Sequence, residues 1–155
     1  MIKILIAGEG GQGVQSIAEI LAKAAFLENK KALYIPNFGV EQRGGVSLAF
    51  VVIDDKQVIY PKFENADIIA ILSERSRKRI ENYLNNKTKL ILGPAITQEL
   101  INLPNKAWNI FILGQINKED KIVSKQSLIK AMDERFTNQF AKNPQLREIN
   151  IKALG

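Results

Sequence analysis

The sequence predicts a single α/β domain, with a mostly parallel sheet and helices on both of its faces. Short apolar runs rich in β-branched residues, such as 2–7 and 89–92, alternate with segments of helical periodicity. Glycine or proline follows several of these runs, which is typical of strands that end at a sharp turn. The chain of 155 residues is long enough to enclose one hydrophobic core, so we expect one domain over 1–155.

The predicted elements alternate along the chain. Strands are expected over 2–7, 32–35, 66–72, 89–92 and 109–113. The first helix follows from apolar residues at helical spacing, namely Val14, Ile17, Ala18, Leu21 and Ala25. Further helices are expected near 76–86, through Leu128, Met132, Phe136 and Phe140, and over 144–155. Strands separated by helices usually run parallel, because each helix returns the chain to the edge where the previous strand began.

The stretch around 46–60 departs from this alternation. Two runs with strand composition, 46–53 and 58–60, flank the polar turn residues Asp54-Asp55-Lys56-Gln57. We therefore expect a β-hairpin inserted into the α/β pattern around 46–60.

The composition excludes several kinds of chemistry. Cysteine and histidine are both absent. That rules out Cys-ligated iron–sulfur clusters, conventional zinc sites, cysteine nucleophiles and a Ser-His-Asp triad within this chain. We expect neither catalytic residues nor metal ligands here. No apolar run approaches the roughly 20 residues of a membrane span, and the start has no secretory signal, so a cytoplasmic location without membrane contact is expected.

A formal net charge of +6 raises the question of nucleic acid. The lysines are spread along the chain, and the one dense cluster is Arg75, Arg77, Lys78 and Arg79. No aromatic side chains are interleaved there to stack on bases. The cluster is better interpreted as a solvated helix face, or as a basic rim facing an acidic partner, and we expect no nucleic-acid partner.

The sequence GEGGQGVQ, residues 8–15, follows the first strand directly. Gly8, Gly10 and Gly13 match the glycine pattern of Rossmann-like dinucleotide sites, in which a helix N-terminus faces a phosphate. The acidic residue expected at the end of the second strand is missing from 34–38, and no Lys-Ser or Lys-Thr follows the glycines as a P-loop requires. The glycines can instead shape the turn and the helix packing, or allow another chain or a phosphate to approach the backbone.

A second glycine motif, FGVEQRGGVS, begins at Phe38. Loops at the carboxyl ends of parallel strands gather at one edge of a sheet, so we expect this segment to lie near the first loop. Its polar residues Glu41 and Arg43, followed by Gly44 and Gly45, are either a recognition surface or a solvated turn.

Together, GEGGQGV, FGVEQRGGVS and IYPKFENADIIAIL resemble the gamma subunit of 2-oxoacid:ferredoxin oxidoreductases. The resemblance covers about residues 2–115, and the tail is similar to the last helix of that family. Phe38 stands where the family usually has tyrosine. The resemblance implies a non-catalytic subunit of a complex that oxidatively decarboxylates a 2-oxoacid to acyl-CoA and CO2, with ferredoxin as electron acceptor. It also implies that the isolated chain is inactive and that it helps to assemble the complex.

The resemblance implies partners as well. These are alpha, beta and ferredoxin-like delta subunits, or fusions of them, which hold thiamine diphosphate and the iron–sulfur clusters; this chain binds no cofactor. Gly10, Gly11, Gln12 and Gly13 are expected to contact coenzyme A (CoA) or a partner chain. The basic charge would suit CoA phosphates or an acidic partner surface.

An interface is expected at Glu41, Arg43, Gly44 and Gly45. The identity of the 2-oxoacid does not follow from this chain. The alternative is a stand-alone Rossmann-type nucleotide-binding enzyme.

Overall fold

The computed structural model describes residues 1–38, 45–58 and 63–155. A five-stranded sheet has the order β2-β3-β1-β4-β5. The strands are β1 (Ile2–Glu9), β2 (Lys31–Phe38), β3 (Val46–Asp54), β4 (Ile68–Ile71) and β5 (Lys89–Leu92). Strand β4 is parallel to β1 and to β5, whereas β3 is antiparallel to both of its neighbours, β1 and β2. All strands except β3 therefore point the same way, and the predicted mostly parallel sheet is confirmed.

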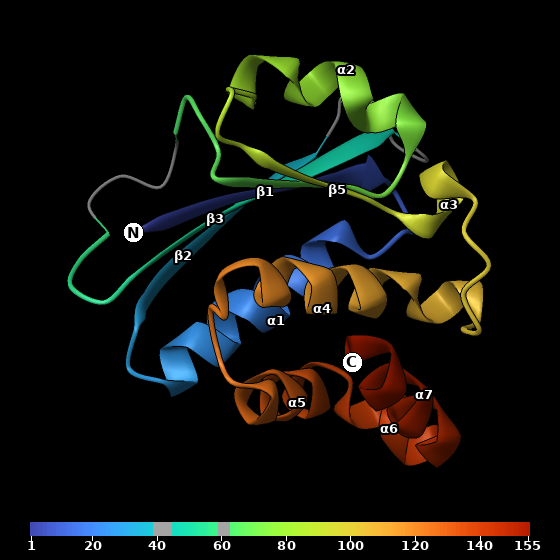
Figure 1. The fold of residues 1–155 in the computed structure, drawn as a ribbon. Helices are drawn as coiled ribbons and strands as arrows, with labels where there is room; N and C mark the ends of the chain where they lie inside the picture. The colour runs from blue at the N-terminus through green and yellow to red at the C-terminus, as the bar shows by residue number, and fades with distance from the viewer. Residues whose placement is uncertain (39–44, 59–62) are drawn as a thin grey trace.

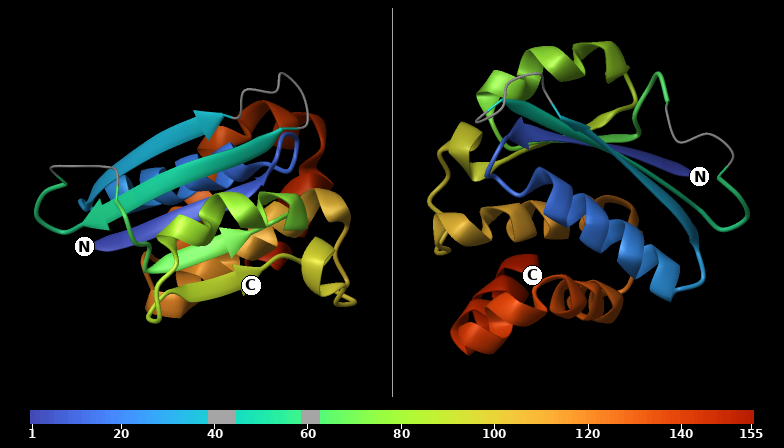
Figure 2. Two further views of the ribbon diagram at one scale, coloured as in Figure 1. Left: turned by 90° about the horizontal axis from the view of Figure 1, so that it is seen from above. Right: turned by 180° about the vertical axis from the view of Figure 1, so that it is seen from behind.

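Helices cover both faces of the sheet, as predicted (Figure 1). On one face lie α1 (Val14–Leu27) and α4 (Trp108–Asp120), and behind them α5 (Lys125–Arg135), α6 (Thr137–Lys142) and α7 (Pro144–Leu154) form a further layer. The other face is covered by η1 (Glu74–Ser76), α2 (Arg77–Ile80) and η2 (Glu81–Tyr83). The short α3 (Pro94–Thr97) follows β5, and η3 (Asn105–Ala107) precedes α4. The two views of Figure 2 show the same layers.

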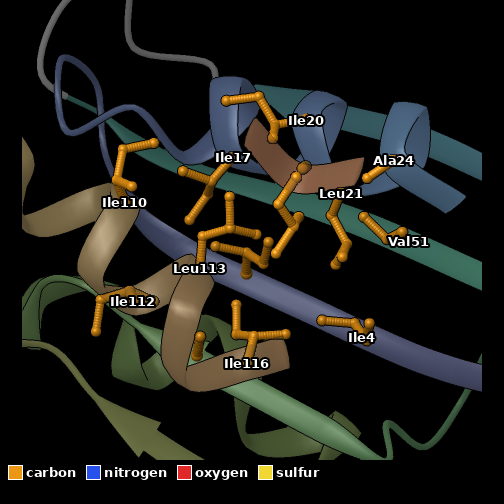
Figure 3. Close-up of a cluster of buried hydrophobic side chains, with 14 of the residues drawn as sticks. Ile4, Ile17, Ile20, Leu21, Ala24, Val51, Ile110, Ile112, Leu113 and Ile116 are labelled. Atoms are coloured by element: carbon orange, nitrogen blue, oxygen red, sulfur yellow. The ribbon is translucent and has the colours of Figure 1, made fainter. Parts of the chain in front are cut away.

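The core divides into two clusters because side chains alternate along each strand. In β1, Ile4 and Ile6 face α1 and α4, whereas Leu5 and Ala7 face the α2 side. All four are fully buried, which explains why the strand is a continuous apolar run rather than an alternating one. Figure 3 shows the larger cluster, where side chains of α1 and α4 meet over β1 and β3.

The hairpin next to β1 differs from the predicted one. Its arms are β2 and β3, which pair antiparallel from Lys31 with Asp54 to Phe38 with Ser47. The other edge of β3 pairs with β1, from Val46 with Glu9 to Ile53 with Ile2. Both edges of β3 are therefore occupied by other strands. Of the predicted second arm, Val58 is outside any strand, and residues 59 and 60 lie outside the described residues.

The strand predicted over 109–113 is wrong, because these residues belong to the helix α4. Ile110, Ile112, Leu113 and Ile116 are all buried, since α4 lies between the sheet and the layer of α5, α6 and α7. A helix buried on opposite sides has no polar face, and its apolar run then resembles that of a buried strand.

Smaller differences concern where elements end. The second strand continues through Pro36, which pairs with Ala49, and proline is tolerated because β2 is at the edge of the sheet. The helix predicted through Leu128–Phe140 is two helices, α5 and α6, separated at Phe136. The helix near 76–86 is the shorter α2 with a 3-10 turn on each side. The helix predicted over 144–155 is confirmed as α7.

Candidate functional site

The carboxyl ends of β1, β4 and β5 meet at one edge of the sheet, because these strands are parallel. From β1 the chain passes through α1 to β2 on one side, and it returns later to β4 on the other side. Ligands of open α/β sheets usually bind at such a switch point, outside the carboxyl ends of the strands. A pocket of about 460 Å³ lies there, lined by the glycine loop, Leu72, the start of α3 and the start of α4. We call it the glycine-loop pocket.

Two glycines of the loop have backbone conformations that disfavour other residues. Gly11 has φ +88° and Gly13 has φ +80°. Gly13 is the N-cap of α1, and its carbonyl oxygen accepts a hydrogen bond from Ile17 N at 3.2 Å. Apart from its chain neighbours, no heavy atom of the described residues lies within 4 Å of a Cβ atom placed on Gly11. The backbone of Gly11 is therefore open to an approaching molecule.

Gln12 was predicted to contact CoA or a partner chain, but its side-chain amide forms hydrogen bonds within this chain. Its side-chain oxygen accepts a hydrogen bond from Glu9 N at 2.8 Å, and its side-chain nitrogen donates to Leu72 O at 3.3 Å. The amide thus folds back under the loop and joins the end of β1 to the end of β4. Gln12 lines the pocket, but its side-chain hydrogen bonds hold the loop in shape.

Close packing leaves no room for a side chain at Gly8 or at Gly13. A Cβ atom on Gly8 would lie 2.8 Å from both Gln12 Oε1 and Val14 Cγ2. A Cβ atom on Gly13 would lie 2.3 Å from Asn109 Nδ2. Asn109 therefore packs directly against the start of α1. Asn109 and the nearby Lys106 line the pocket. Asn109 was expected to begin a strand, and neither residue was predicted as part of the site.

A charged cluster joins the ends of β1 and β4 next to the loop. The Ser73 hydroxyl donates a hydrogen bond to the Glu9 carboxylate at 2.5 Å, and Arg75 donates to the same carboxylate at 3.3 Å. Ser73 also accepts a hydrogen bond from Arg75 N at the start of η1. The Ser73 hydrogen bond, supported by Arg75, holds the pKa of Glu9 below its ordinary value.

The lowered pKa of Glu9 predicts a pH dependence. A carboxyl whose pKa is lower in the folded chain stabilises the fold above its unfolded pKa, and this contribution disappears as the pH falls through the folded pKa. Glu9→Gln is expected to cost about 0.5–1 kcal/mol at neutral pH. The difference in unfolding free energy between the wild type and this variant should become smaller as the pH falls below 4.5, the ordinary pKa of a glutamate side chain. Urea denaturation between pH 7 and pH 3 measures it, with Glu99→Gln as an exposed control; a gap that stays constant with pH would contradict the assignment.

The second glycine motif meets the first. Gly10 N donates a hydrogen bond to Gly45 O at 3.0 Å, and Gly45 is buried. The expectation that both motifs share one edge is met at this point. Glu41, Arg43 and Gly44 lie outside the described residues, and their role as an interface stays a prediction.

The sheet order disfavours the dinucleotide interpretation of the glycine pattern. In a Rossmann fold the acidic residue that holds the ribose follows β2, which lies beside β1. Here β3 separates β2 from β1. The end of β2 is therefore two strand spacings, about 10 Å, from the glycine loop, and it carries Asn37 and Phe38 rather than a carboxylate.

The described residues contain neither a candidate membrane span nor a candidate metal site. None of the helices in the described ranges combines the length and apolar character that a membrane span needs. In the same ranges, no three acidic side chains come together in a group that could hold a metal ion.

The fold and the site define an α/β protein with an open glycine loop at the carboxyl edge of its sheet. The chain matches the family model described as pyruvate ferredoxin/flavodoxin oxidoreductase over residues 3–112. It is 33% identical over 169 residues to the pyruvate/ketoisovalerate oxidoreductases common subunit gamma of Thermococcus litoralis. That alignment covers 92% of this chain and 90% of the relative. The chain is 47% identical over 163 residues to pyruvate synthase subunit PorC of Methanothermobacter thermautotrophicus, with 92% and 89% covered. The chain belongs to the pyruvate ferredoxin/flavodoxin oxidoreductase family, and the resemblance read from its motifs is confirmed.

A solved structure has the same fold. It is 2-oxoglutarate:ferredoxin oxidoreductase from Magnetococcus marinus, with 2-oxoglutarate, coenzyme A and succinyl-CoA bound. The match has a TM-score of 0.84 and 17% sequence identity, and it covers 99% of this chain but 29% of that chain. The fold of this protein therefore also occurs as one part of a longer polypeptide.

Proposed function

We propose that this chain is the gamma-type subunit of a 2-oxoacid:ferredoxin oxidoreductase. The complex would oxidatively decarboxylate a 2-oxoacid to acyl-CoA and CO2 and pass the electrons to ferredoxin. The observation that carries the proposal is the junction of the two glycine motifs through Gly10 and Gly45, in a chain whose curated relatives are gamma and PorC subunits over nearly their whole length.

The role proposed for this chain is assembly rather than chemistry. It contains no cysteine and no histidine, so it has no ligand for an iron–sulfur cluster and no imidazole for proton transfer. Thiamine diphosphate and the clusters are assigned to partner chains of alpha, beta and ferredoxin-like delta type, or to fusions of them. A cytoplasmic location is part of the proposal.

The glycine-loop pocket is proposed to lie on the path of CoA or against a partner chain. Gly11 leaves its backbone open, and Lys106 adds a positive charge at the same pocket. The amides at the start of α1 favour an anion such as a phosphate. The M. marinus enzyme of the same fold was solved with CoA bound. Backbone contact at Gly10, Gly11, Gln12 and Gly13 is the interaction that this pocket would provide.

Selection of the 2-oxoacid is assigned to the partner chains. The T. litoralis relative is a subunit common to pyruvate and ketoisovalerate oxidoreductases, so one chain of this type serves enzymes with different substrates. A gamma-type chain that contacted the variable part of the 2-oxoacid would be poorly suited to such sharing.

Reconstitution tests the proposal. The chains encoded beside this one are produced with and without it, and 2-oxoacid-dependent reduction of a viologen dye is measured with CoA and thiamine diphosphate. We expect no turnover by this chain alone. Leaving it out should lower the turnover of the remaining chains at least tenfold. Full activity without this chain, or turnover by this chain alone, would contradict the assignment.

The runner-up is a stand-alone nucleotide-binding enzyme, which only the pattern of Gly8, Gly10 and Gly13 favours. It predicts a chain that stays monomeric and catalyses a reaction without partners. Size-exclusion chromatography with the partner chains distinguishes the two functions.

A further inference from the structure

A second, smaller pocket lies behind the glycine-loop pocket. It has a volume of about 210 Å³ and is formed by residues of α1, α6 and α7 and of the segment around the start of α4. Lys106 and Asn109 line both pockets, so these two side chains are the wall between them. Pockets for whole drug-sized ligands usually measure about 300–1,000 Å³. The smaller pocket therefore suits a single ring system, with the remainder of the ligand outside.

Asn150 supplies a buried hydrogen-bond acceptor to this pocket. Its residue is 4% exposed, and its side-chain nitrogen donates to Leu146 O at 2.9 Å within α7. Its side-chain oxygen accepts no hydrogen bond from any described residue. No fully buried side-chain oxygen or nitrogen of the described chain lacks a partner, so the Asn150 oxygen must keep some exposed surface. Since Asn150 lines the pocket, we infer that this oxygen faces it and can accept an N–H or O–H of a ligand.

Aromatic rings form another wall of the pocket. Phe136 and Phe140 lie with their centroids 5.5 Å apart and their planes inclined by 59°. Phe140 is 8% exposed, and the apolar side chains of Ile110 and Leu146 also line the space. Flat apolar walls with one buried acceptor fit a planar heterocycle that carries an amino group.

The mouth of the pocket provides a positive charge. Lys106 is exposed and forms no ion pair with any described residue. Because it also lines the glycine-loop pocket, a phosphate held by Lys106 would connect a ring in the smaller pocket with the loop at Gly11.

We propose that this smaller pocket binds the adenine ring of a nucleotide. The exocyclic amine donates to Asn150 Oδ1, the ring lies against Phe136 and Phe140, and the phosphate extends past Lys106. Two sources share this chemistry: a free adenine nucleotide, and the ADP end of CoA. The second source rests on the proposed function of the glycine-loop pocket; the first does not.

A matched ligand pair tests the base contact. The full chain is titrated with AMP and with IMP, in which a carbonyl oxygen replaces the amine, and binding is followed by calorimetry. We expect AMP to bind at least tenfold more tightly than IMP, because the IMP oxygen would face the Asn150 oxygen without a hydrogen between them. Equal affinities, or no binding of AMP at millimolar concentration, would overturn the proposal; the latter would also be the result if the pocket receives only a partner's side chain.

Two variants test the named residues. Asn150→Leu should weaken AMP at least tenfold and abolish the preference over IMP, while Asn138→Leu on the neighbouring helix, outside the pocket, should leave both unchanged. Should Asn150→Leu fail to fold, Lys106→Met remains as a test at an exposed position. It should weaken AMP while leaving adenosine, which has no phosphate, as in the wild type. Wild-type AMP binding by the folded Asn150→Leu chain or by Lys106→Met would contradict the assignment.

Competition identifies the source. If the ADP end of CoA occupies the pocket, CoA displaces AMP and pantetheine does not. If CoA fails to displace AMP, the source is a free nucleotide. Reconstitution of the complex is measured separately, so that loss of AMP binding with normal assembly counts against this pocket alone. Normal AMP binding by a chain that joins no complex counts against the proposed function alone.

Discussion

Replacing Gly11 with asparagine is expected to leave the isolated chain folded and to reduce the activity of the assembled complex at least tenfold. Asparagine tolerates the positive φ of Gly11 better than other residues with a side chain. In the part of the chain that the structure describes, no heavy atom beyond the chain neighbours lies within 4 Å of its Cβ. The space that it fills is the space that CoA or a partner chain is proposed to use. Thermal melting of the chain and viologen reduction by the complex measure the two effects.

A series at the same position separates strain from obstruction. Backbone strain at positive φ is least for asparagine and greatest for valine, at about 1–3 kcal/mol. Obstruction depends on size, so alanine should disturb the complex least. If complex activity follows the melting temperatures of the Gly11→Ala, Gly11→Asn and Gly11→Val chains, strain is the cause. An asparagine variant with wild-type melting and wild-type activity would remove Gly11 from the proposed contact.

Replacing Gly114 with leucine is expected to lower the free energy of unfolding by about 3 kcal/mol, the upper end of the usual cost of overpacking. A Cβ atom at Gly114 would lie 2.3 Å from Leu154 O and 3.0 Å from Leu154 C. These are backbone atoms of α7, so α7 must move away from α4. For a chain of this size the melting temperature should fall by about 6–12 °C.

The neighbouring substitution Gln115→Leu is the control, because Gln115 is only partly buried on the same helix. It should melt within a few degrees of the wild type. Hydrogen exchange in α7 should increase in Gly114→Leu and stay unchanged in the control. Unaltered stability of Gly114→Leu would mean that α4 and α7 can separate at little cost.

The apolar runs predicted the layers of the fold well, but not every element. The prediction for 109–113 was wrong because Ile110, Ile112 and Leu113 lie in a helix that is buried on opposite sides. Helical periodicity shows only when one face is polar, and α4 has none in this stretch. Pro104 and the polar residues that follow it are a helix-start signal that would have favoured α4.

Local sequence patterns could not predict which strands pair with one another. The run at 46–53 was correctly read as a strand, yet its partners are β1 and β2, which lie earlier in the chain. Composition indicates that a segment is extended, but pairing is decided by which faces must be buried together. The turn residues after Asp54 are compatible with a hairpin and do not require one.

The candidate site was predictable in part. The pattern of Gly8, Gly10 and Gly13 located the loop and its helix, because a sharp turn between a strand and a helix needs residues that adopt positive φ, as Gly13 does. The pocket walls were not predictable, since Lys106 and Asn109 come from a segment almost 100 residues later. The inward direction of Gln12 also depends on Leu72 O, an acceptor directly after the end of β4.

Trp108 is an intrinsic fluorescent probe of the glycine-loop pocket. It is the sole tryptophan of the sequence, it lines that pocket, and its indole N–H donates to Leu103 O at 3.3 Å. Emission excited selectively from indole therefore comes from this edge of the sheet alone. Quenching or a blue shift of this emission reports whether the pocket is filled with solvent, occupied by a ligand or covered by a partner chain, without any attached dye. Partner chains in which tryptophan is replaced by phenylalanine would extend this signal to the assembled complex, and its time course would give the rate at which the edge closes.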